Sequence, residues 1–240
     1  MNAANIKAIA FLYFAILKLD PQNAKKHDRD RFILSKGHGA PALFQILGMK
    51  GFYPVSDLEH FGEDGGVFAE HPPTPDYLPG IEAATGSLGH GMPMGLGMAM
   101  ASKILDQPYN VYALLGDGEC NEGSVWEASM SAAHFKLDNL IAIVDYNKLQ
   151  SDGNSETVMD IGLLEKKWES FGWDVISLDG HDIVALNDAL SHSANNMKPK
   201  VIIAHTTKGK GVSFMENNNT WHHNRLTQTT FDQAIAELNL

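Results

Sequence analysis

Short apolar segments alternate along this chain with longer segments of helical periodicity, and this pattern limits the fold more than any other feature. Strands that are apolar at every position are typical of a parallel sheet covered on both faces, whereas half-exposed strands alternate. The expected strands cover residues 32–34, 111–115, 140–144, 175–178 and 201–204, and the expected helices cover residues 5–19, 40–49, 86–105, 122–135, 161–171 and 183–194. The sequence therefore predicts an α/β fold, a parallel β-sheet flanked by helices.

The composition fits a single domain over residues 1–240 with one substantial core, since 44% of the residues are hydrophobic. A formal net charge of −11 argues against nucleic acid as a partner, because phosphate backbones are bound by basic surfaces. An anionic ligand would need a metal, backbone N–H groups or a few placed cations.

Two features bear on the compartment. The single cysteine excludes an internal disulfide, as is usual in a reducing cytoplasm. The apolar run at residues 8–17 is too short to span a bilayer and is followed by no small-residue cleavage site, so we expect a buried helix. We therefore expect a cytoplasmic protein with no membrane partner.

Polar side chains lie a few residues after three of the predicted strands. Asp117, Asn147 and Lys208 should therefore meet at the carboxyl edge of the sheet, where α/β proteins bind their ligands. The Gly-Asp-Gly loop at 116–118 is common in turns, but 28 residues forming a βαβ unit separate it from Asn147 and bring both to one edge. The oxygens of Asp117 and Asn147 and the Leu149 carbonyl, with two phosphate oxygens and a water, would suit Mg²⁺. These residues predict a metal–diphosphate site.

Four motifs, in the family's order, resemble those of transketolases. They are Asp-Arg-Asp-Arg-Phe-Ile-Leu-Ser-Lys-Gly-His at 28–38, Pro-Gly-Ile-Glu-Ala-Ala-Thr-Gly-Ser-Leu-Gly-His-Gly at 79–91, the segment 116–148 that opens Gly-Asp-Gly-Glu-Cys-Asn-Glu-Gly and ends Asp-Tyr-Asn-Lys, and Thr-Thr-Lys-Gly-Lys-Gly at 206–211 followed by Trp-His at 221–222. Gly-Asp-Gly followed about thirty residues later by Asn resembles the thiamine diphosphate signature. The resemblance implies the diphosphate-binding domain of a thiamine diphosphate fold.

The resemblance also implies a role for each matching position. A metal ion (Mg²⁺, or Ca²⁺ or Mn²⁺ in its place) would be held by Asp117, Asn147 and Leu149. Contacts to thiamine diphosphate are implied for His38, Gly86, Leu88, Gly116, Asp117, Gly118, Glu119, Asn147, Lys208 and His222. The implied catalytic set is His38, His71, His222 and Glu122, the last as a subunit-contact carboxylate that supports the partner's glutamate. His181, in Asp-Gly-His-Asp before a helix, is instead expected to be a turn or cap residue.

Two departures from the family pattern concern the ends of the chain. Transketolases usually carry a Ser-Gly-His-x-Gly-Gly segment ahead of the first helix, whereas this chain begins Met-Asn-Ala-Ala-Asn-Ile. Truncation, altered chemistry or substrate, and compensation by another residue are the alternatives. The family's pyrimidine-binding and C-terminal domains are expected on a partner chain. The resemblance therefore implies the N-terminal subunit of a split transketolase, active only with a partner chain that carries the pyrimidine domain, in a heterotetramer of two copies of each.

The implied reaction is transfer of a two-carbon ketol unit from a ketose phosphate to an aldose phosphate. An alternative is the α subunit of another thiamine diphosphate enzyme, either a 2-oxo acid dehydrogenase or a deoxyketose synthase. The Lys-Gly-His and Thr-Gly-Ser-Leu-Gly-His-Gly motifs favour transketolase. A third possibility is a non-catalytic cofactor-binding subunit; the intact pair Asp117 and Asn147 argues against it.

Overall fold

A five-stranded parallel β-sheet forms the centre of the molecule in a computed structural model that describes residues 3–191 and 197–238. The strands lie in the order β1-β2-β3-β7-β6. They are β1 (Arg31–Leu34), β2 (Val111–Gly116), β3 (Leu140–Tyr146), β6 (Asp174–Asp179) and β7 (Lys200–His205). A separate antiparallel hairpin consists of β4 (Leu149–Gln150) and β5 (Gly153–Asn154). The predicted parallel α/β sheet is confirmed.

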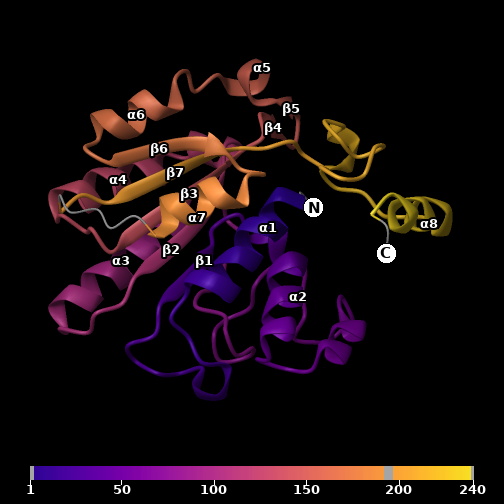
Figure 1. Ribbon diagram of the computed structural model, residues 1–240, viewed down its shortest axis with the longest axis horizontal. Coiled ribbons are helices and arrows are strands. Elements are labelled where there is room, and N and C mark those ends of the chain that lie inside the picture. The colour runs from indigo at the N-terminus through magenta and orange to yellow at the C-terminus, as the bar shows by residue number, and fades with distance from the viewer. Residues whose placement is uncertain (1–2, 192–196, 239–240) are drawn as a thin grey trace.

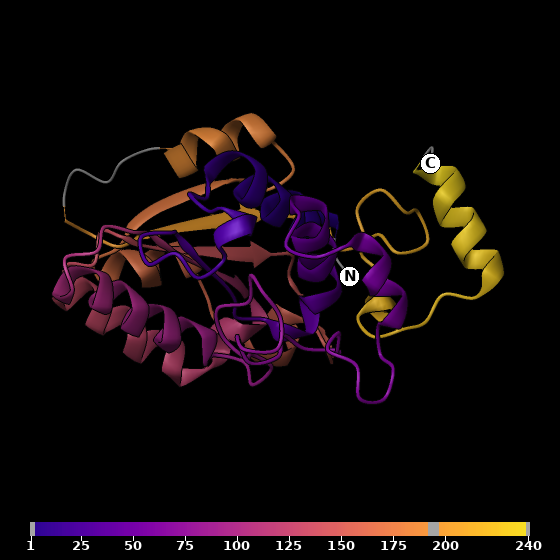
Figure 2. The same cartoon turned by 90° about the horizontal axis from the view of Figure 1, so that it is seen from below.

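Helices cover both faces of this sheet (Figure 1, Figure 2). One face packs on α1 (Ala3–Phe11), α2 (Ala40–Lys50) and α7 (Ile183–Ser191). The other packs on α3 (Gly91–Ile104), α4 (Gly123–His134) and α6 (Leu164–Ser170). Two further helices, α5 (Ser155–Met159) and α8 (Gln228–Glu237), lie beyond the sheet edge.

Strand β3 shows why the apolar runs are continuous. Its residues Leu140, Ala142 and Val144 point into the core on the α3–α4 side, while Ile141 and Ile143 point into the core on the α1–α2 side. Because successive side chains of a strand point to opposite faces, a sheet buried on both sides needs an apolar residue at every position.

Several helix boundaries differ from the sequence expectation for local backbone reasons. The first helix ends at Phe11 and continues only as a π-helical turn, Leu12–Ile16. The helix expected from residue 86 begins at Gly91, because Gly89 has a φ of 79° that a right-handed helix excludes. Helix α6 likewise begins after Gly162, whose φ is 68°. Helix α7 is described as far as Ser191, and residues 192–194 of its expected range lie outside the described residues.

The carboxyl ends of β2, β3 and β7 lie together at the edge that carries β4, β5 and the loop toward α8 (Figure 1). In register, Gly116 pairs with Asp145, and Tyr146 pairs with His205. The residues that follow, Asp117, Asn147 and the segment leading to Lys208, therefore leave the sheet side by side. The predicted convergence at one edge is confirmed.

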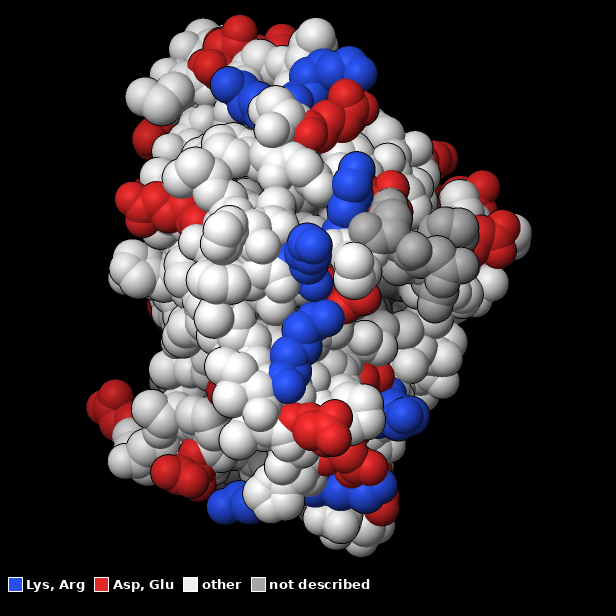
Figure 3. All heavy atoms as spheres, turned by 90° about the vertical axis from the view of Figure 1, so that its left-hand side faces the viewer, with Lys and Arg blue, Asp and Glu red and all other residues white. Residues whose placement is uncertain are grey.

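At the opposite end of the molecule, the described residues expose side chains of both charges. Figure 3 shows a short row of Lys and Arg there, interspersed with Asp and Glu. Lys103 and Asp138 form one ion pair of 2.6 Å. Among the described helices, none is both long and apolar enough to cross a lipid bilayer.

Candidate functional site at the carboxyl edge

A buried ion pair lies at the centre of the carboxyl edge. The Lys36 ammonium, from the turn after β1, lies 2.5 Å from Oδ2 of Asp145 at the end of β3, and both side chains are buried. Thr206 Oγ1 donates to the other carboxylate oxygen, and Asn147 Nδ2 donates to Oδ2 at 2.9 Å. Burial is the largest influence on Asp145 and opposes its ionisation, but the charge of Lys36 and the hydrogen bonds from Lys36, Thr206 and Asn147 together outweigh it and lower the pKa of this carboxyl. Asp145 therefore fixes the ends of three neighbouring segments.

Asp117 is a buried carboxylate of a different kind. Its Oδ2 accepts a hydrogen bond of 2.9 Å from Ser155 Oγ, the first residue of α5. Burial raises the pKa of Asp117, and the charge of Asp145 adds to this effect, while the Ser155 hydrogen bond offsets only part of it. A carboxylate whose ionised form is disfavoured in this way is stabilised by a bound cation.

The neighbouring oxygens suit a hard cation. Asn147 Oδ1 accepts the N–H of Leu149 at 3.0 Å, which bends the chain after β3 toward the hairpin. Among the described residues, no group of three or more His, Cys, Asp or Glu side chains could hold a metal. An ion beside Asp117 would therefore need neutral oxygens, such as those of Asn147 and Leu149, and oxygens of its own ligand.

A cluster of one lysine and two histidines faces the same edge. Lys208 Nζ lies 2.7 Å from His222 Nδ1, and the His222 and His38 rings are 5.7 Å apart between centroids. Dehydration by the surrounding protein is the main cause that lowers the pKa of His38 to about 4 and that of His222 to about 4, and nearby lysines add to it. Burial, followed by repulsion from Lys36, lowers the pKa of Lys208 to about 8. At pH 7 the two imidazoles are neutral and Lys208 is cationic.

The glycines of the family motifs lie where two turns meet. A side chain on Gly37 would place its Cβ 2.7 Å from the Thr85 carbonyl and the Gly86 nitrogen, so the turn that carries His38 packs backbone to backbone on the segment before Leu88. A Cβ on Gly86 would lie 3.1 Å from the ring of His71, which is exposed. His38, His71 and Gly86 are thus neighbours.

Two other predicted positions are explained by contacts within the chain. A Cβ on Gly118 would lie 2.8 Å from the Gln150 side chain, so this glycine allows the hairpin to approach the loop after β2. Glu122 is exposed at the start of α4, where its Cβ lies against Gly89. Gly116 ends β2 directly before Asp117.

Glu119 joins three of the sequence motifs. Its buried carboxylate accepts hydrogen bonds from Ser35 Oγ at 2.5 Å, from Gly89 N at 2.8 Å and from Gly116 N at 3.1 Å. These donors come from the Ser-Lys-Gly-His, Gly-Ser-Leu-Gly and Gly-Asp-Gly segments. Its oxygens are engaged by the chain itself, which favours a supporting role for Glu119 over direct contact with a cofactor.

Replacing Glu119 with Gln is expected to lower the free energy of unfolding by about 2 kcal/mol, because the new NH₂ group faces a backbone N–H and leaves one buried donor unpaired. Urea unfolding of the purified chain measures this change. Glu127→Gln, an exposed substitution on α4, is the matched control and should leave the midpoint unchanged. Equal urea midpoints for Glu119→Gln and Glu127→Gln would contradict the role of Glu119 in holding the three segments together.

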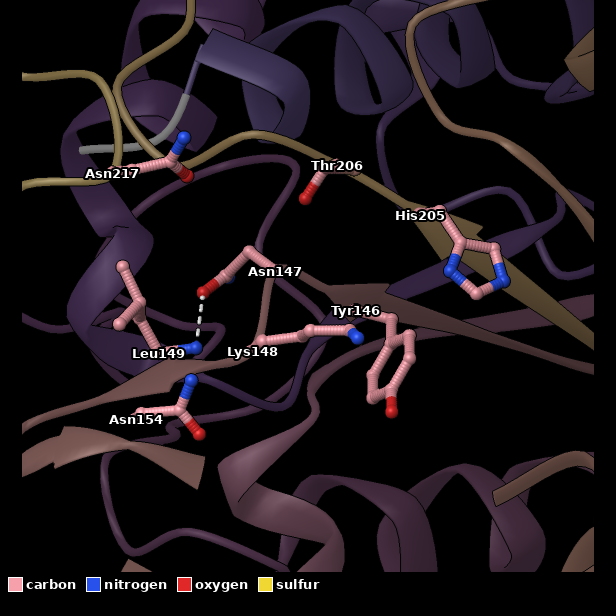
Figure 4. A pocket seen from close by; sticks show the side chains of 8 residues that line it. All are labelled: Tyr146, Asn147, Lys148, Leu149, Asn154, His205, Thr206 and Asn217. Carbon is pink, nitrogen blue, oxygen red and sulfur yellow. Dashed lines mark hydrogen bonds between the residues drawn. The ribbon is translucent and has the colours of Figure 1, made fainter. Parts of the chain in front are cut away.

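A cavity of about 380 Å³ opens beside these groups. It is lined by residues from the ends of β3 and β7, the hairpin β4–β5 and the adjoining loops (Figure 4), namely Tyr146, Asn147, Lys148, Leu149, Asn154, His205, Thr206 and Asn217. Lys36, Ser155 and Thr206 were not among the site residues predicted from the sequence. Lys36 and Thr206 do lie within the family motifs, and Lys36 also lies in a glycine-rich turn at the end of a predicted strand, where functional residues are common.

The carboxyl edge of the sheet combines a buried carboxylate that a cation would stabilise, neutral oxygens, and a lysine with two histidines. This combination is typical of α/β proteins that bind an anionic cofactor at the carboxyl ends of their strands. The family model described as the thiamine diphosphate binding domain of transketolase matches residues 1–239. The chain belongs to the transketolase family and comprises its thiamine diphosphate-binding domain.

Similar proteins include both separate subunits and longer chains. The chain is 42% identical to an apulose-4-phosphate transketolase subunit of Phocaeicola vulgatus over 97% of its own length and 83% of that protein. It is 41% identical to the 6-deoxy-6-sulfo-D-fructose transketolase subunit SqwG of a Clostridium strain, covering 97% and 84% of the two chains. The transketolase structure from Leishmania mexicana superposes with a TM-score of 0.90 at 28% identity, and the chain spans 99% of itself but 40% of that protein.

Proposed function

We propose that this chain is the diphosphate-binding subunit of a thiamine diphosphate-dependent transketolase that transfers a two-carbon ketol unit from a ketose phosphate to an aldose phosphate. The observation that carries the proposal is the buried Asp117 carboxylate, whose ionised form is disfavoured in the chain alone and which follows β2 next to the end of β3, the strand that leads to Asn147 and Leu149. A divalent cation held by these residues would compensate the charge of the carboxylate and part of the charge of a diphosphate.

In this proposal Asp117, Asn147 and the Leu149 carbonyl hold Mg²⁺, or Ca²⁺ or Mn²⁺ in its place. Gly116, Gly118, His38, Lys208 and His222 surround the diphosphate, while Gly86 and Leu88 line the ring end of the cofactor. Glu119 supports these segments from behind. Bound thiamine diphosphate would supply the electron sink for C–C cleavage.

The residues of the chain would then bind and orient the reactants. His38 and His222 stay neutral at pH 7, so each can donate from one ring nitrogen and accept at the other. Lys208 donates to His222 Nδ1, which leaves the proton of this ring on Nε2 to face a ligand. His71, exposed beside Gly86, is placed to contact substrate hydroxyls. Glu122, exposed at the start of α4, would meet the partner chain.

The partner in this proposal is a separate chain that carries the pyrimidine-binding and C-terminal domains, and two copies of each form a heterotetramer. Two relatives that the chain covers by 83% and 84% are named as transketolase subunits, which supports a divided enzyme. The single cysteine, Cys120, is buried and free, consistent with a reducing cytoplasm. The sugars named for these two relatives differ, so the substrate requires a direct assay.

The decisive experiment combines the chain with its partner, thiamine diphosphate and Mg²⁺ and supplies a panel of ketose phosphates with aldose phosphate acceptors. Transfer of two carbons, measured by mass spectrometry of the new ketose, is expected only when both chains are present. Release of CO₂ from pyruvate would instead support a 2-oxo acid dehydrogenase or, if the remaining two carbons are joined to an aldehyde acceptor to give a deoxyketose, a deoxyketose synthase. Tight cofactor binding without any turnover would support a non-catalytic subunit.

The pKa of Lys208 predicts a pH dependence of cofactor affinity. Lys208 carries its charge below about pH 8 and loses it as the pH rises through this value. Binding of an anionic diphosphate favours the charged form, so the dissociation constant of thiamine diphosphate should increase about tenfold between pH 7 and pH 9. Lys208→Arg, which remains charged, should show a flat profile over this range. Calorimetric titration of the two-chain complex at fixed Mg²⁺ measures both, and parallel profiles would contradict the role of Lys208.

A further inference from the structure

The turn between β6 and α7 contacts the segment that carries Lys208. It consists of Asp179, Gly180, His181 and Asp182. Asp182 is the residue that caps α7, since its carboxylate accepts the N–H groups of Val184 at 2.9 Å and Ala185 at 3.1 Å. The His181 ring is therefore not needed as a cap and points elsewhere.

The ring of His181 binds the backbone of the neighbouring loop. Its Nε2 accepts the N–H of Thr207 at 2.8 Å. An accepting Nε2 is unprotonated, so the neutral ring carries its proton on Nδ1. That Nδ1 is buried and has no hydrogen-bond partner in the part of the chain that the structure describes. Among the described residues, the hydrogen bond from Thr207 N–H is thus the one that the His181 ring makes.

The residues beside His181 hold the same segment. Gly180 N donates to the carbonyl of His205 at 2.8 Å. A Cβ on Gly180 would lie 2.5 Å from Thr206 Cγ2, so only glycine permits this approach. Asp179 Oδ1 accepts the N–H of His181 at 2.9 Å and shapes the turn. The turn therefore contacts three consecutive residues, His205, Thr206 and Thr207.

The segment from His205 to Thr207 continues into the candidate site. Thr206 Oγ1 donates to Asp145, the carboxylate paired with Lys36. One residue beyond Thr207, Lys208 places its ammonium 2.7 Å from His222 Nδ1, and its carbonyl accepts the N–H of Asn217 at 2.9 Å. Any rotation of the peptide between Thr206 and Thr207 would move both the Asp145 contact and the Lys208 side chain.

We propose that His181 is a positioning residue of the diphosphate site: by accepting the Thr207 N–H it fixes the peptide that aims Lys208 at His222 and at the bound diphosphate. The inference rests on the proposed function in taking Lys208 as a diphosphate contact. His181 itself touches neither cofactor nor substrate. Its effect is on the affinity for the cofactor rather than on the chemistry.

The test compares two substitutions at His181 in the complex of the full chain with its partner. His181→Leu removes the acceptor, whereas the amide oxygen of His181→Gln can reach the position of Nε2. His181→Leu is expected to weaken thiamine diphosphate binding in the presence of Mg²⁺ about tenfold and to leave kcat at saturating cofactor within about twofold of wild type. His181→Gln should recover most of the affinity. His134→Gln, an exposed histidine on α4, is the control.

A double-mutant cycle with Lys208→Met separates positioning from a general loss of structure. In that background His181→Leu should weaken binding less than about twofold, because the side chain that it positions is gone. If His181→Leu does not fold, His181→Asn, whose amide is too short to reach Thr207, replaces it.

The outcomes decide between the claims. Wild-type cofactor affinity in His181→Leu, or an undiminished effect beside Lys208→Met, overturns the positioning role while the proposed function stands. Absence of thiamine diphosphate binding by the wild-type complex overturns the proposed function and the inference with it.

Discussion

Replacing Asp117 with Ala is expected to lower the transketolase turnover of the two-chain complex at least about 100-fold at saturating sugar phosphate. Asp117 is the one carboxylate in the proposed metal set, and Asn147 and Leu149 contribute only neutral oxygens. Without it, the cation of the proposed site would lose its charged ligand. Steady-state rates of the wild-type and Asp117→Ala complexes at increasing Mg²⁺ and thiamine diphosphate give the size of the loss in turnover.

The same position predicts an opposite effect on stability. In the chain without cofactor, burial and the charge of Asp145 disfavour ionised Asp117. Asp117→Asn keeps an oxygen for the Ser155 hydroxyl and removes the charge, so it should raise the thermal midpoint of the isolated chain while it lowers activity. Asp152→Ala, an exposed carboxylate in the hairpin, is the control and should change neither quantity. An Asp117→Asn enzyme with wild-type turnover would exclude a metal at this carboxylate.

Replacing Lys36 with Met is expected to cost about 3–5 kcal/mol of unfolding free energy, because it leaves the Asp145 carboxylate buried without its counter-charge. The hydrogen bonds from Thr206 and Asn147 remain but supply no net positive charge. Equilibrium urea unfolding of the chain, followed by circular dichroism, measures the change.

The double variant Lys36→Met, Asp145→Asn tests the cause of this loss. With both charges removed, most of the unfolding free energy should return, since the penalty arises from an uncompensated charge and not from the missing methylene packing. A stability of Lys36→Met within about 1 kcal/mol of wild type would show that water or a rearranged side chain compensates Asp145.

Much of the sheet could be predicted because its strands are buried on both faces. The run 140–144, apolar at every position, predicted β3 to within two residues. The hairpin β4–β5 and helix α5 were not predicted, because two-residue strands and a five-residue helix have no periodicity to detect. Helix α8 was missed as well. Its start is set by a capping box between Thr227 and Thr230, a signal weaker than an apolar stripe.

The site was predictable where chain topology alone brings residues together. Asp117 and Asn147 follow adjacent strands of one βαβ unit, so the sequence sufficed to bring them to one edge. The pairing of Lys36 with Asp145 and the contact of Ser155 with Asp117 depend on how turns far apart in sequence pack in space. For Glu119, the family motif indicated importance, but only the packing of three turns around its carboxylate explains it.

The contact between Gly37 and the Thr85–Gly86 peptide has a consequence for how the protein can diversify. Together with the hydrogen bond from Thr85 Oγ1 to the Leu34 carbonyl at 2.7 Å, it joins the two ends of the segment 38–84. In this segment helix α2 packs on the sheet, and residues 51–84 form the loop that connects the helix to Thr85. Doubling the length of a loop whose ends are already fixed costs only about 0.6 kcal/mol. Under the proposed function, insertions and deletions around the exposed His71 would change the part of the edge that faces the sugar at a low cost in folding free energy, while the residues proposed to hold the diphosphate keep their positions.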